Sequence, residues 1–388
     1  MLSVIGALAQ LRDAAPDRVW PVLEEVAAPL ARDLVLYLVD FEQVVLLPVH
    51  DSAQLRVIPE EDVRASLAGR AFVTGRPVVA TRDGQIRLWV PVNEHSERTG
   101  VLAMTVADDD PTTLEQAASL GVLAGLLVAS AARYTDLMHS RRLGRTMSLA
   151  ASMQWSLLPP LTARTHTTTI AGLLEPAYEV AGDAFDYTIN GDRIDLAIFD
   201  AMGHGIGSSQ LASLAVGSYR HARRNGETLQ NVHLAIDDAL SQQYAGEAFA
   251  TGLLVRLDQP TGQLSWTNAG HPLPLLLRDR KVVGHLECEP SAPFGLEDGG
   301  AAMATENLHP GDTVLLYTDG VVEARTPRGE EFGLDRLCDL LRREAAAETP
   351  PDEMLRRLIR ALLEHHGGEL RDDATLVLLS WQPNNKPA

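Results

Sequence analysis

Four acidic clusters in the second half of the chain hold the side chains that could do chemistry. They are Ala181-Gly-Asp183-Ala-Phe-Asp186, Phe199-Asp200-Ala-Met-Gly-His-Gly205, Tyr317-Thr-Asp319-Gly320 and Arg371-Asp372-Asp373-Ala-Thr375. Asp200 and Asp319 each follow an apolar stretch of strand character, so we expect their carboxylates where a buried sheet meets solvent. In three clusters glycine or another small residue flanks the aspartate, which lets backbone approach a bound ion closely.

Carboxylates that converge on one place need positive charge beside them. A single aspartate at a strand end usually caps a turn, and that interpretation suffices for any one cluster. Four together would repel one another unless cations offset their charge. Ligand sets made only of oxygen select hard ions such as Mg²⁺ or Mn²⁺ over zinc. Two such ions about 3.5–4 Å apart lower the pKa of a shared water and hold a phosphoryl oxygen, so that hydroxide attacks phosphorus in line without a covalent enzyme intermediate.

The elements that must position these carboxylates alternate between strands and helices. This order predicts an α+β sandwich, and not a doubly wound sheet with a glycine-rich nucleotide loop. Strands are predicted over 193–199, 250–257, 263–268, 313–317 and 374–381, and helices over 208–224, 229–244, 334–344 and 354–365.

The first third of the chain predicts a smaller α+β domain. The pattern indicates a hairpin over 34–49, a helix over 60–74 that stops at Gly75, three further strands, and a long helix from Thr112. Residues 134–158 are helical in pattern, with Leu143, Ala150 and Leu157 at heptad spacing, and predict one continuous helix. The expected domains are therefore 1–132, a helical linker over 133–160, and 161–383.

Composition and charge exclude several classes of protein. The net charge of −19 argues against a nucleic-acid groove, which needs clustered basic residues. The chain has two cysteines, Cys288 and Cys338, which provide neither a disulfide framework nor a thiolate zinc cluster. The start lacks the basic region of a signal peptide. The uncharged segment 116–132 falls short of the roughly 20 apolar residues of a membrane span and predicts a buried or dimer-forming helix. We expect a cytoplasmic protein without membrane insertion, and the linker favours a homodimer.

The order of five motifs resembles the PPM phosphatases, and within them the bacterial SpoIIE and RsbU type, relatives of protein phosphatase 2C. Besides the acidic clusters, Asn268-Ala-Gly-His-Pro272 and Pro310-Gly-Asp-Thr-Val-Leu-Leu-Tyr-Thr-Asp-Gly-Val-Val-Glu-Ala324 contribute to the resemblance. Gln154-Trp-Ser-Leu-Leu-Pro159 resembles the segment that leads into that domain. The resemblance spans about 154–381 and implies an α-β-β-α sandwich.

The resemblance also implies a site with two Mn²⁺ or Mg²⁺ ions. Asp183, Asp200 and the backbone carbonyl of Ala201 would bind one ion. Asp200, Asp319 and Asp372 would bind the other, with Asp200 as the bridge between the two.

Several neighbouring residues receive other interpretations. Asp373 either orients the last ligand, binds an outer-shell water or caps a turn, and Asp186 is expected in a turn. The family usually has two glycines before the first aspartate, whereas Ala181 replaces one here. Met202 stands where animal relatives place a histidine, so His204 is a weak candidate for a general acid and a loop residue by preference. His271 is expected to be structural.

The first domain resembles a GAF sensor domain through its order of elements and Gly69-Arg-Ala-Phe-Val-Thr-Gly-Arg-Pro-Val. Such domains bind a small ligand or serve only for dimerisation, and both remain open here. No cysteine lies in this part, which excludes a thioether-linked chromophore. His50 and His95 could touch a cofactor, although lone histidines of this kind usually lie on the surface.

The sequence as a whole predicts a metal-dependent serine/threonine phosphoprotein phosphatase in signal transduction. By resemblance, the substrate would be a phosphorylated anti-anti-sigma factor of the STAS fold, and its dephosphorylation would regulate a sigma factor. One alternative is a catalytically inactive phosphatase fold that serves as a regulatory binding module. Another is a nucleotide cyclase, which the missing glutamate after Asp183 and the three later acidic motifs disfavour.

Overall fold

The computed structural model describes residues 15, 19–49, 58–179, 182–296, 300–368, 370 and 372–383. The chain divides into two compact units, Met1–Thr146 and Met147–Ala388. We describe each unit by itself.

The N-terminal unit is built on an antiparallel six-stranded sheet with the order β3-β2-β1-β6-β5-β4. Helices α2 and α4 pack on one face of this sheet, and α3 packs on the other. The elements are α2 (Val19–Ala27), β1 (Ala31–Val39), β2 (Val45–Val49), β3 (Glu61–Asp62), α3 (Leu67–Thr74), β4 (Val78–Arg82), β5 (Gln85–Glu94), β6 (Glu97–Val106) and α4 (Pro111–Ala131).

The hairpin predicted over 34–49 is confirmed, whereas the helix predicted over 60–74 starts later than expected. Asp40 turns the hairpin, because its Oδ1 accepts hydrogen bonds from the backbone N–H groups of Val44 and Val45. Asp62 pairs with Val45 of β2 and therefore belongs to a strand. Helix α3 begins only after Ser66, whose hydroxyl caps it.

Helix α4 covers the sheet as a core element. It has the length and apolar composition of a membrane span, and 44% of its most apolar window is buried inside the unit. Two glycines bring it close to strand β5: a Cβ at Gly121 would lie 2.3 Å from the Pro91 carbonyl oxygen, and one at Gly125 would lie 2.0 Å from that of Asn93. The predicted helix is confirmed and packs on the sheet, but it does not fall short of the length of a membrane span as expected, and its outer side, with Val122 and Leu126, is exposed.

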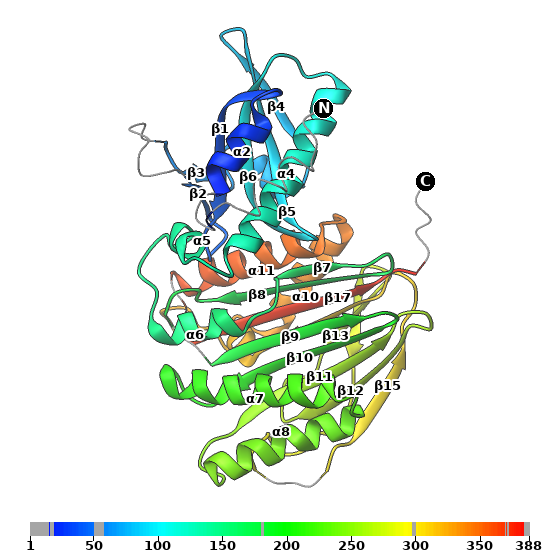
Figure 1. Ribbon diagram of the computed structural model, residues 1–388. Helices are drawn as coiled ribbons and strands as arrows, with labels where there is room; N and C mark the ends of the chain where they lie inside the picture. Colours follow the sequence, from blue (N-terminus) through cyan, green and yellow to red (C-terminus); the bar gives the residue numbers. More distant parts are fainter. Residues whose placement is uncertain are drawn as a thin grey trace. The chain divides into compact units, whose positions relative to one another are not determined.

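The C-terminal unit contains two stacked antiparallel sheets (Figure 1). The five-stranded sheet has the order β15-β12-β11-β10-β9, and the six-stranded sheet has the order β14-β13-β16-β17-β8-β7. The strands are β7 (Thr162–Arg164), β8 (Thr168–Glu175), β9 (Asp183–Asn190), β10 (Arg193–Ala201), β11 (Ala250–Asp258), β12 (Gln263–Ala269), β13 (Leu275–Arg278), β14 (Lys281–His285), β15 (Met303–Asn307), β16 (Thr313–Tyr317) and β17 (Ala374–Trp381).

Three hydrophobic clusters define four layers in this unit. One cluster fills the space between the sheets, with Phe185 and Val377 among its buried side chains. A second joins the five-stranded sheet to α7 (Ile206–Arg224) and α8 (Leu229–Tyr244). A third joins the six-stranded sheet to α10 (Leu334–Ala346) and α11 (Pro351–His366), while the short α9 (Asp319–Val322) follows β16. The predicted α-β-β-α sandwich is confirmed.

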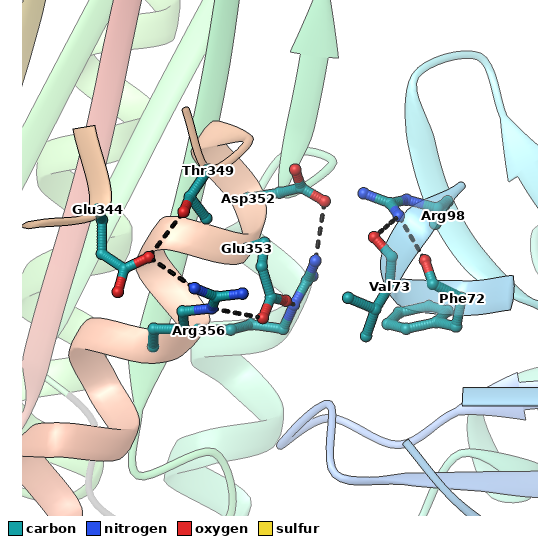
Figure 2. Close-up of polar contacts among 9 residues, drawn as sticks. Phe72, Val73, Arg98, Glu344, Thr349, Asp352, Glu353 and Arg356 are labelled. Atoms are coloured by element: carbon teal, nitrogen blue, oxygen red, sulfur yellow. Dashed lines mark hydrogen bonds and ion pairs between the residues drawn. The ribbon is translucent and has the colours of Figure 1, made fainter. Parts of the chain in front are cut away.

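Ion pairs fix the connection between α10 and α11. Arg356 binds Asp352 and Glu353 at the start of α11 (Figure 2). Glu344 accepts hydrogen bonds from Thr349 and Arg357, which joins the end of α10 to α11. In the N-terminal unit, Figure 2 also shows Arg98 donating to the backbone carbonyls of Phe72 and Val73, the last turn of α3.

The segment between the expected domains differs from the single helix that its pattern predicts. It forms two short helices, α5 (Leu137–Arg141) and α6 (Leu149–Leu157). The Ser148 side chain accepts a hydrogen bond from the Ala151 N–H and caps α6, while the Ser148 N–H donates to the Tyr178 carbonyl. This cap starts a new helix, so Leu143 lies outside both helices and the heptad pattern does not follow one helix face. Helix α6 belongs to the C-terminal unit.

Candidate metal centre

The two sheets of the C-terminal unit each deliver two of the predicted carboxylates. Asp183 is the first residue of β9, and its Cα is paired with that of Asp200 on β10. Asp319 starts α9 directly after β16, and Asp372 lies just before β17, the strand that pairs with β16. The four aspartates, drawn from residues 183–372, therefore occupy the ends of neighbouring strands in both sheets.

The electrostatic coupling among these groups indicates that their carboxylates lie near one another. The pKa of the Asp200 carboxyl is raised to about 7. Burial is the largest cause, and the negative charges of Asp319, Asp372 and Asp373 add to it. Every charged group that shifts this pKa is acidic. The cluster therefore carries negative charge that none of these neighbours offsets.

Asp183 and Asp319 respond in the same direction as Asp200. The pKa of the Asp183 carboxyl lies well above its ordinary value because of burial first and the charge of Asp200 second. Burial, followed by the charge of Asp372, raises the pKa of Asp319. A divalent cation in the cluster would reverse these shifts, because positive charge favours the ionised carboxylates.

Two threonines orient the Asp183 carboxylate. The hydroxyls of Thr318 and Thr375 each donate to Asp183 Oδ2 over 2.7 Å. The Thr318 hydroxyl also accepts the backbone N–H of Thr375 over 2.9 Å, which joins the starts of α9 and β17. All three side chains are buried, so the carboxylate keeps one orientation.

Asp373 holds the backbone that carries Asp183. Its Oδ2 accepts hydrogen bonds from the backbone N–H groups of Gly182 at 2.5 Å and Asp183 at 3.0 Å. Gln154 of α6 donates to the same oxygen at 3.3 Å and to the Asp183 carbonyl at 2.7 Å. Burial raises the pKa of Asp373 to about 6, against the opposing effect of these backbone hydrogen bonds. Of the three interpretations of Asp373, capping of the backbone agrees with these contacts, and the capped backbone is that of Gly182 and Asp183.

Two glycines allow close approach at the site. A Cβ at Gly182 would lie 2.9 Å from the carbonyl oxygen of Ala201, the predicted backbone ligand. A Cβ at Gly320 would lie 1.9 Å from the carbonyl oxygen of Asp373, so α9 can pack against the start of β17 only with glycine there. In both acidic motifs, glycine is therefore needed because a neighbouring backbone carbonyl lies where a side chain would be.

The donor chemistry fits hard divalent cations. Oxygen is the only ligand atom that the cluster offers. Burial first, and repulsion between the carboxylates second, raise the pKa values of the cluster, and such cations would relieve the repulsion. Among the described residues, no group of three or more acidic, histidine or cysteine side chains is placed so that it could hold a metal ion. The fit to hard cations therefore rests on the chemistry of the donor set and on its electrostatics.

Asp186 corrects one prediction. It lies within β9 instead of in a turn, and its side chain is 3% exposed. Its two oxygens bind Arg220 at 2.8 Å and Arg223 at 2.9 Å, both on α7. Asp186 is therefore neutralised by guanidinium groups and fixes α7 to the five-stranded sheet.

The histidines have separate surroundings. His204 is exposed in the loop before α7, and His95 is exposed in the turn between β5 and β6. His271 is buried, its Nδ1 lies 2.8 Å from the Thr251 hydroxyl, and burial lowers its pKa to about 3. Its backbone also exchanges two hydrogen bonds with Asn268, which agrees with a structural role. His50, Ala181 and Arg371 lie outside the described residues.

Sequence reasoning missed three residues that support the site: Gln154, Thr318 and Thr375. Each stands inside a motif that was already singled out, next to or near a predicted ligand. Their polar side chains in otherwise apolar strand and helix ends were a signal that could have identified them. Their partners, however, lie 29–219 residues away and are defined only by the fold.

Comparisons with known proteins relate this unit to phosphatases. The family model described as Stage II sporulation protein E (SpoIIE) matches residues 190–382. Protein IcfG of Synechocystis sp. is 26% identical over 241 residues, which cover 54% of this chain and 37% of IcfG. Phosphoserine phosphatase RsbU of Bacillus subtilis is 24% identical over 237 residues, which cover 60% of this chain and 69% of RsbU.

A solved structure extends the likeness to the fold. The SiaA-PP2C domain of Pseudomonas aeruginosa is 25% identical to this chain with a TM-score of 0.53, over 60% of this chain and 94% of that domain. The chain spans little more than a third of the length of IcfG. The likeness therefore concerns the C-terminal unit.

Proposed function

Residues 190–382 of this chain belong to the SpoIIE family of PPM phosphatases, and on that basis we propose that the protein hydrolyses phosphoserine or phosphothreonine on another protein, with two bound Mn²⁺ or Mg²⁺ ions. The observation that supports this most is the cluster of carboxylates from both sheets, in which every charged group that shifts the pKa of Asp200 is itself acidic. Such a cluster suits a cation-dependent enzyme better than a binding module, because the repulsion between the carboxylates destabilises the fold unless cations bind there.

Each carboxylate has a role in this proposal. Asp183, Asp200 and the Ala201 carbonyl would hold one ion, and Asp200, Asp319 and Asp372 would hold the other. Asp183 Oδ2 is occupied by two threonine hydroxyls, so its Oδ1 is the oxygen that would face a cation. When bound, the ions would lower the pKa of a water and offset the charge of the phosphoryl oxygens.

The described cysteines and His204 do not support a covalent or general-acid route at the carboxylates. The described cysteines, Cys288 and Cys338, belong to other clusters, and burial raises the pKa of each thiol. A raised thiol pKa lowers the fraction of thiolate nucleophile. His204 is exposed and has no contact that would orient it as a general acid among the described residues. The proposed reaction thus depends on the aspartates.

The partners are proposed from the family. The substrate is a phosphorylated regulatory protein, and by resemblance an anti-anti-sigma factor of the STAS fold, in a cytoplasmic pathway of sigma-factor regulation. The N-terminal unit would act as a GAF-like sensor of a small ligand or as a dimerisation module. Val122 and Leu126 support a homodimer, because they lie one helical turn apart on α4 and are 48% and 47% exposed.

Phosphate release from a phosphoserine peptide, measured with and without Mn²⁺, tests the proposal. We expect release only with the metal, and a loss of at least about a hundredfold in Asp200→Asn, because the substitution removes a negative ligand. Arg280→Ala serves as the control, since Arg280 makes an exposed ion pair with Glu348 on the surface. No phosphate release by the unmodified chain with Mn²⁺, and none by Asp200→Asn, would reject the proposal in favour of an inactive binding module.

A further inference from the structure

A cavity of about 400 Å³ adjoins the carboxylates on the side of the six-stranded sheet. Asp319 and Asp372 form one wall, and the segment from Glu323 to Gly329 forms another. His366, the last residue of α11, and Leu370 close the remainder. Its volume lies in the usual range for sites that bind small ligands or short peptide segments.

The segment that forms the second wall is held in one conformation. Arg325 and Glu331 form an antiparallel β-bridge, and the Thr326 N–H donates to the Glu330 carbonyl over 2.9 Å. The Phe332 N–H donates to the Ala324 carbonyl over 2.8 Å, and the Phe332 ring is 4% exposed in the core beneath α10 and α11. The cavity is therefore a formed feature of the fold, since backbone pairing and a buried anchor define its wall.

Two polar side chains of the cavity, His366 and Arg325, have groups that could form further hydrogen bonds. The Nδ1 atom of His366 is buried without a hydrogen-bond partner in the described part of the chain. A buried polar atom of this kind usually marks a place where a ligand or water binds. Arg325 extends from the wall and pairs with Glu331, with 60% of its side chain exposed. Arg325 is therefore open to a molecule that reaches the carboxylates through this cavity, and such a molecule would also lie beside His366, which lines the cavity.

The charge of the cavity limits what it can hold. Glu331 balances the guanidinium of Arg325, and Glu323 adds a further negative charge to the lining. A second phosphate or a strongly acidic segment would meet net repulsion here. A neutral or basic polypeptide segment would not, and its backbone can offer carbonyl and N–H groups to His366.

We propose that this cavity binds the residues that flank the phosphorylated serine or threonine, and that His366 and Arg325 determine substrate specificity. The inference rests on the proposed phosphatase function. The phosphoryl group would lie at the carboxylates, and the adjoining polypeptide would lie along the wall formed by residues 323–329. A small phosphate ester would use the carboxylates alone.

Two substrates and a small set of variants test the proposal. We compare kcat/KM for a nine-residue phosphoserine peptide with neutral flanks with kcat/KM for p-nitrophenyl phosphate, at saturating Mn²⁺. In His366→Ala and in Arg325→Ala, the ratio of peptide to ester should fall about three- to tenfold, mainly through the KM for the peptide, as expected for one lost hydrogen bond. His366→Asn should restore most of the ratio, because its amide can hydrogen-bond near the position of Nδ1.

Two further variants separate specificity from structure. Glu331→Gln breaks the same ion pair as Arg325→Ala but keeps the guanidinium, so the ratio should not fall. Arg280→Ala removes an exposed, paired arginine elsewhere and should leave both rates unchanged. A ratio that is unchanged in His366→Ala and Arg325→Ala, or equal losses with Glu331→Gln, would overturn the inference. No hydrolysis of either substrate by the unmodified chain would overturn the proposed function itself, and the inference with it.

Discussion

At the residue scale, the molecule places several carboxylates where each raises the energy of the others. Asp200 is the centre of this arrangement, because three neighbouring aspartates act on it and burial withdraws it from water. The hydrogen bonds of Thr318 and Thr375 to Asp183 stabilise only one member of the cluster. The site therefore costs stability in the metal-free protein and is stabilised by cations.

This cost predicts an unusual pH dependence of the metal-free protein. A pKa raised to about 7 means that folded Asp200 keeps a proton that the unfolded chain, with a pKa near 3.8, has released. The free energy of unfolding should therefore fall as pH rises from about 4 to about 7, by about 2 kcal/mol between pH 5.5 and pH 8. Urea unfolding in the presence of EDTA, at several pH values, measures this free energy.

Asp200→Asn should flatten this dependence and stabilise the metal-free protein at pH 8. Asp339→Asn is the matched control, because Asp339 is an exposed acid on α10 and pairs only with Arg342. Saturating Mn²⁺ should raise the stability of the unmodified chain more than that of Asp200→Asn. A stability that rises with pH in EDTA would contradict the electrostatic description of the site.

Substitution of Asp186 should destabilise the protein, whereas substitution of Asp200 should stabilise its metal-free form, although Asp186 stands only three residues after Asp183. Asp186→Asn would leave Arg220 and Arg223 without their shared carboxylate in a largely buried place. We expect a loss of about 3 kcal/mol in the free energy of unfolding at pH 7, with little change in affinity for Mn²⁺ in the folded protein. A loss of metal binding without a loss of stability would show that Asp186 is a ligand after all.

At the scale of elements, α6 is joined directly to the site. Gln154 bonds both the Asp183 carbonyl and Asp373, and Trp155 donates to the Ala177 carbonyl over 2.8 Å. Ser209 of α7 donates to the Ala150 carbonyl over 3.3 Å, so α6 also contacts the helix after the Asp200 loop. A change in α6 would therefore reach the backbone on both sides of the first two carboxylates.

Gln154→Ala tests this connection. Loss of its two hydrogen bonds should lower the affinity for Mn²⁺ about three- to tenfold, because the backbone of Asp183 is less well fixed. Calorimetric titration measures the affinity, and Ser156→Ala on the exposed side of α6 is the control. Equal affinities in Gln154→Ala and the unmodified chain would separate α6 from the site.

The elements also show where sequence patterns are informative. The long, continuously apolar strands β10, β11 and β17 and the amphipathic helices α10 and α11 were predicted at nearly their observed bounds. Strands β8 and β9 were missed, because Gly172 and the acidic residues of β9 interrupt their patterns. Their places depend on pairing with distant strands, such as Glu175 with Ala374, which local periodicity does not contain.

The same limit applies to the site. The five motifs led to the prediction of the four aspartates through their residue types and their order along the chain. The attachment of Gln154 to Asp373, 219 residues apart, and of Asp186 to α7 is a property of the folded chain. The expected continuous linker helix failed because Ser148 caps α6 and binds Tyr178 of the C-terminal unit.

At the scale of the whole molecule, the boundary between the units lies at Thr146 and Met147, before α6. The C-terminal unit has its own three hydrophobic clusters and includes every residue of the proposed site. It should therefore fold and bind metal alone. Because α6 is part of that unit, a fragment that starts after α6 should be impaired.

Two fragments test this division. Residues 147–388 should unfold cooperatively and bind Mn²⁺ within about threefold of the full chain, whereas residues 161–388 should lose at least about tenfold in affinity, since they lack Gln154 and Trp155. Circular dichroism and calorimetric titration measure both. Equal affinities of the two fragments would place α6 outside the functional unit, and a much weaker 147–388 fragment would show that the N-terminal unit is required.

The most direct measurement is the anomalous X-ray scattering of a crystal of the full chain grown with Mn²⁺. The proposed function predicts two manganese peaks about 3.5–4 Å apart, with Asp200 between them, Asp183 and the Ala201 carbonyl at one, and Asp319 and Asp372 at the other. No peak among these aspartates at saturating Mn²⁺, or the same peaks in Asp200→Asn, would contradict it.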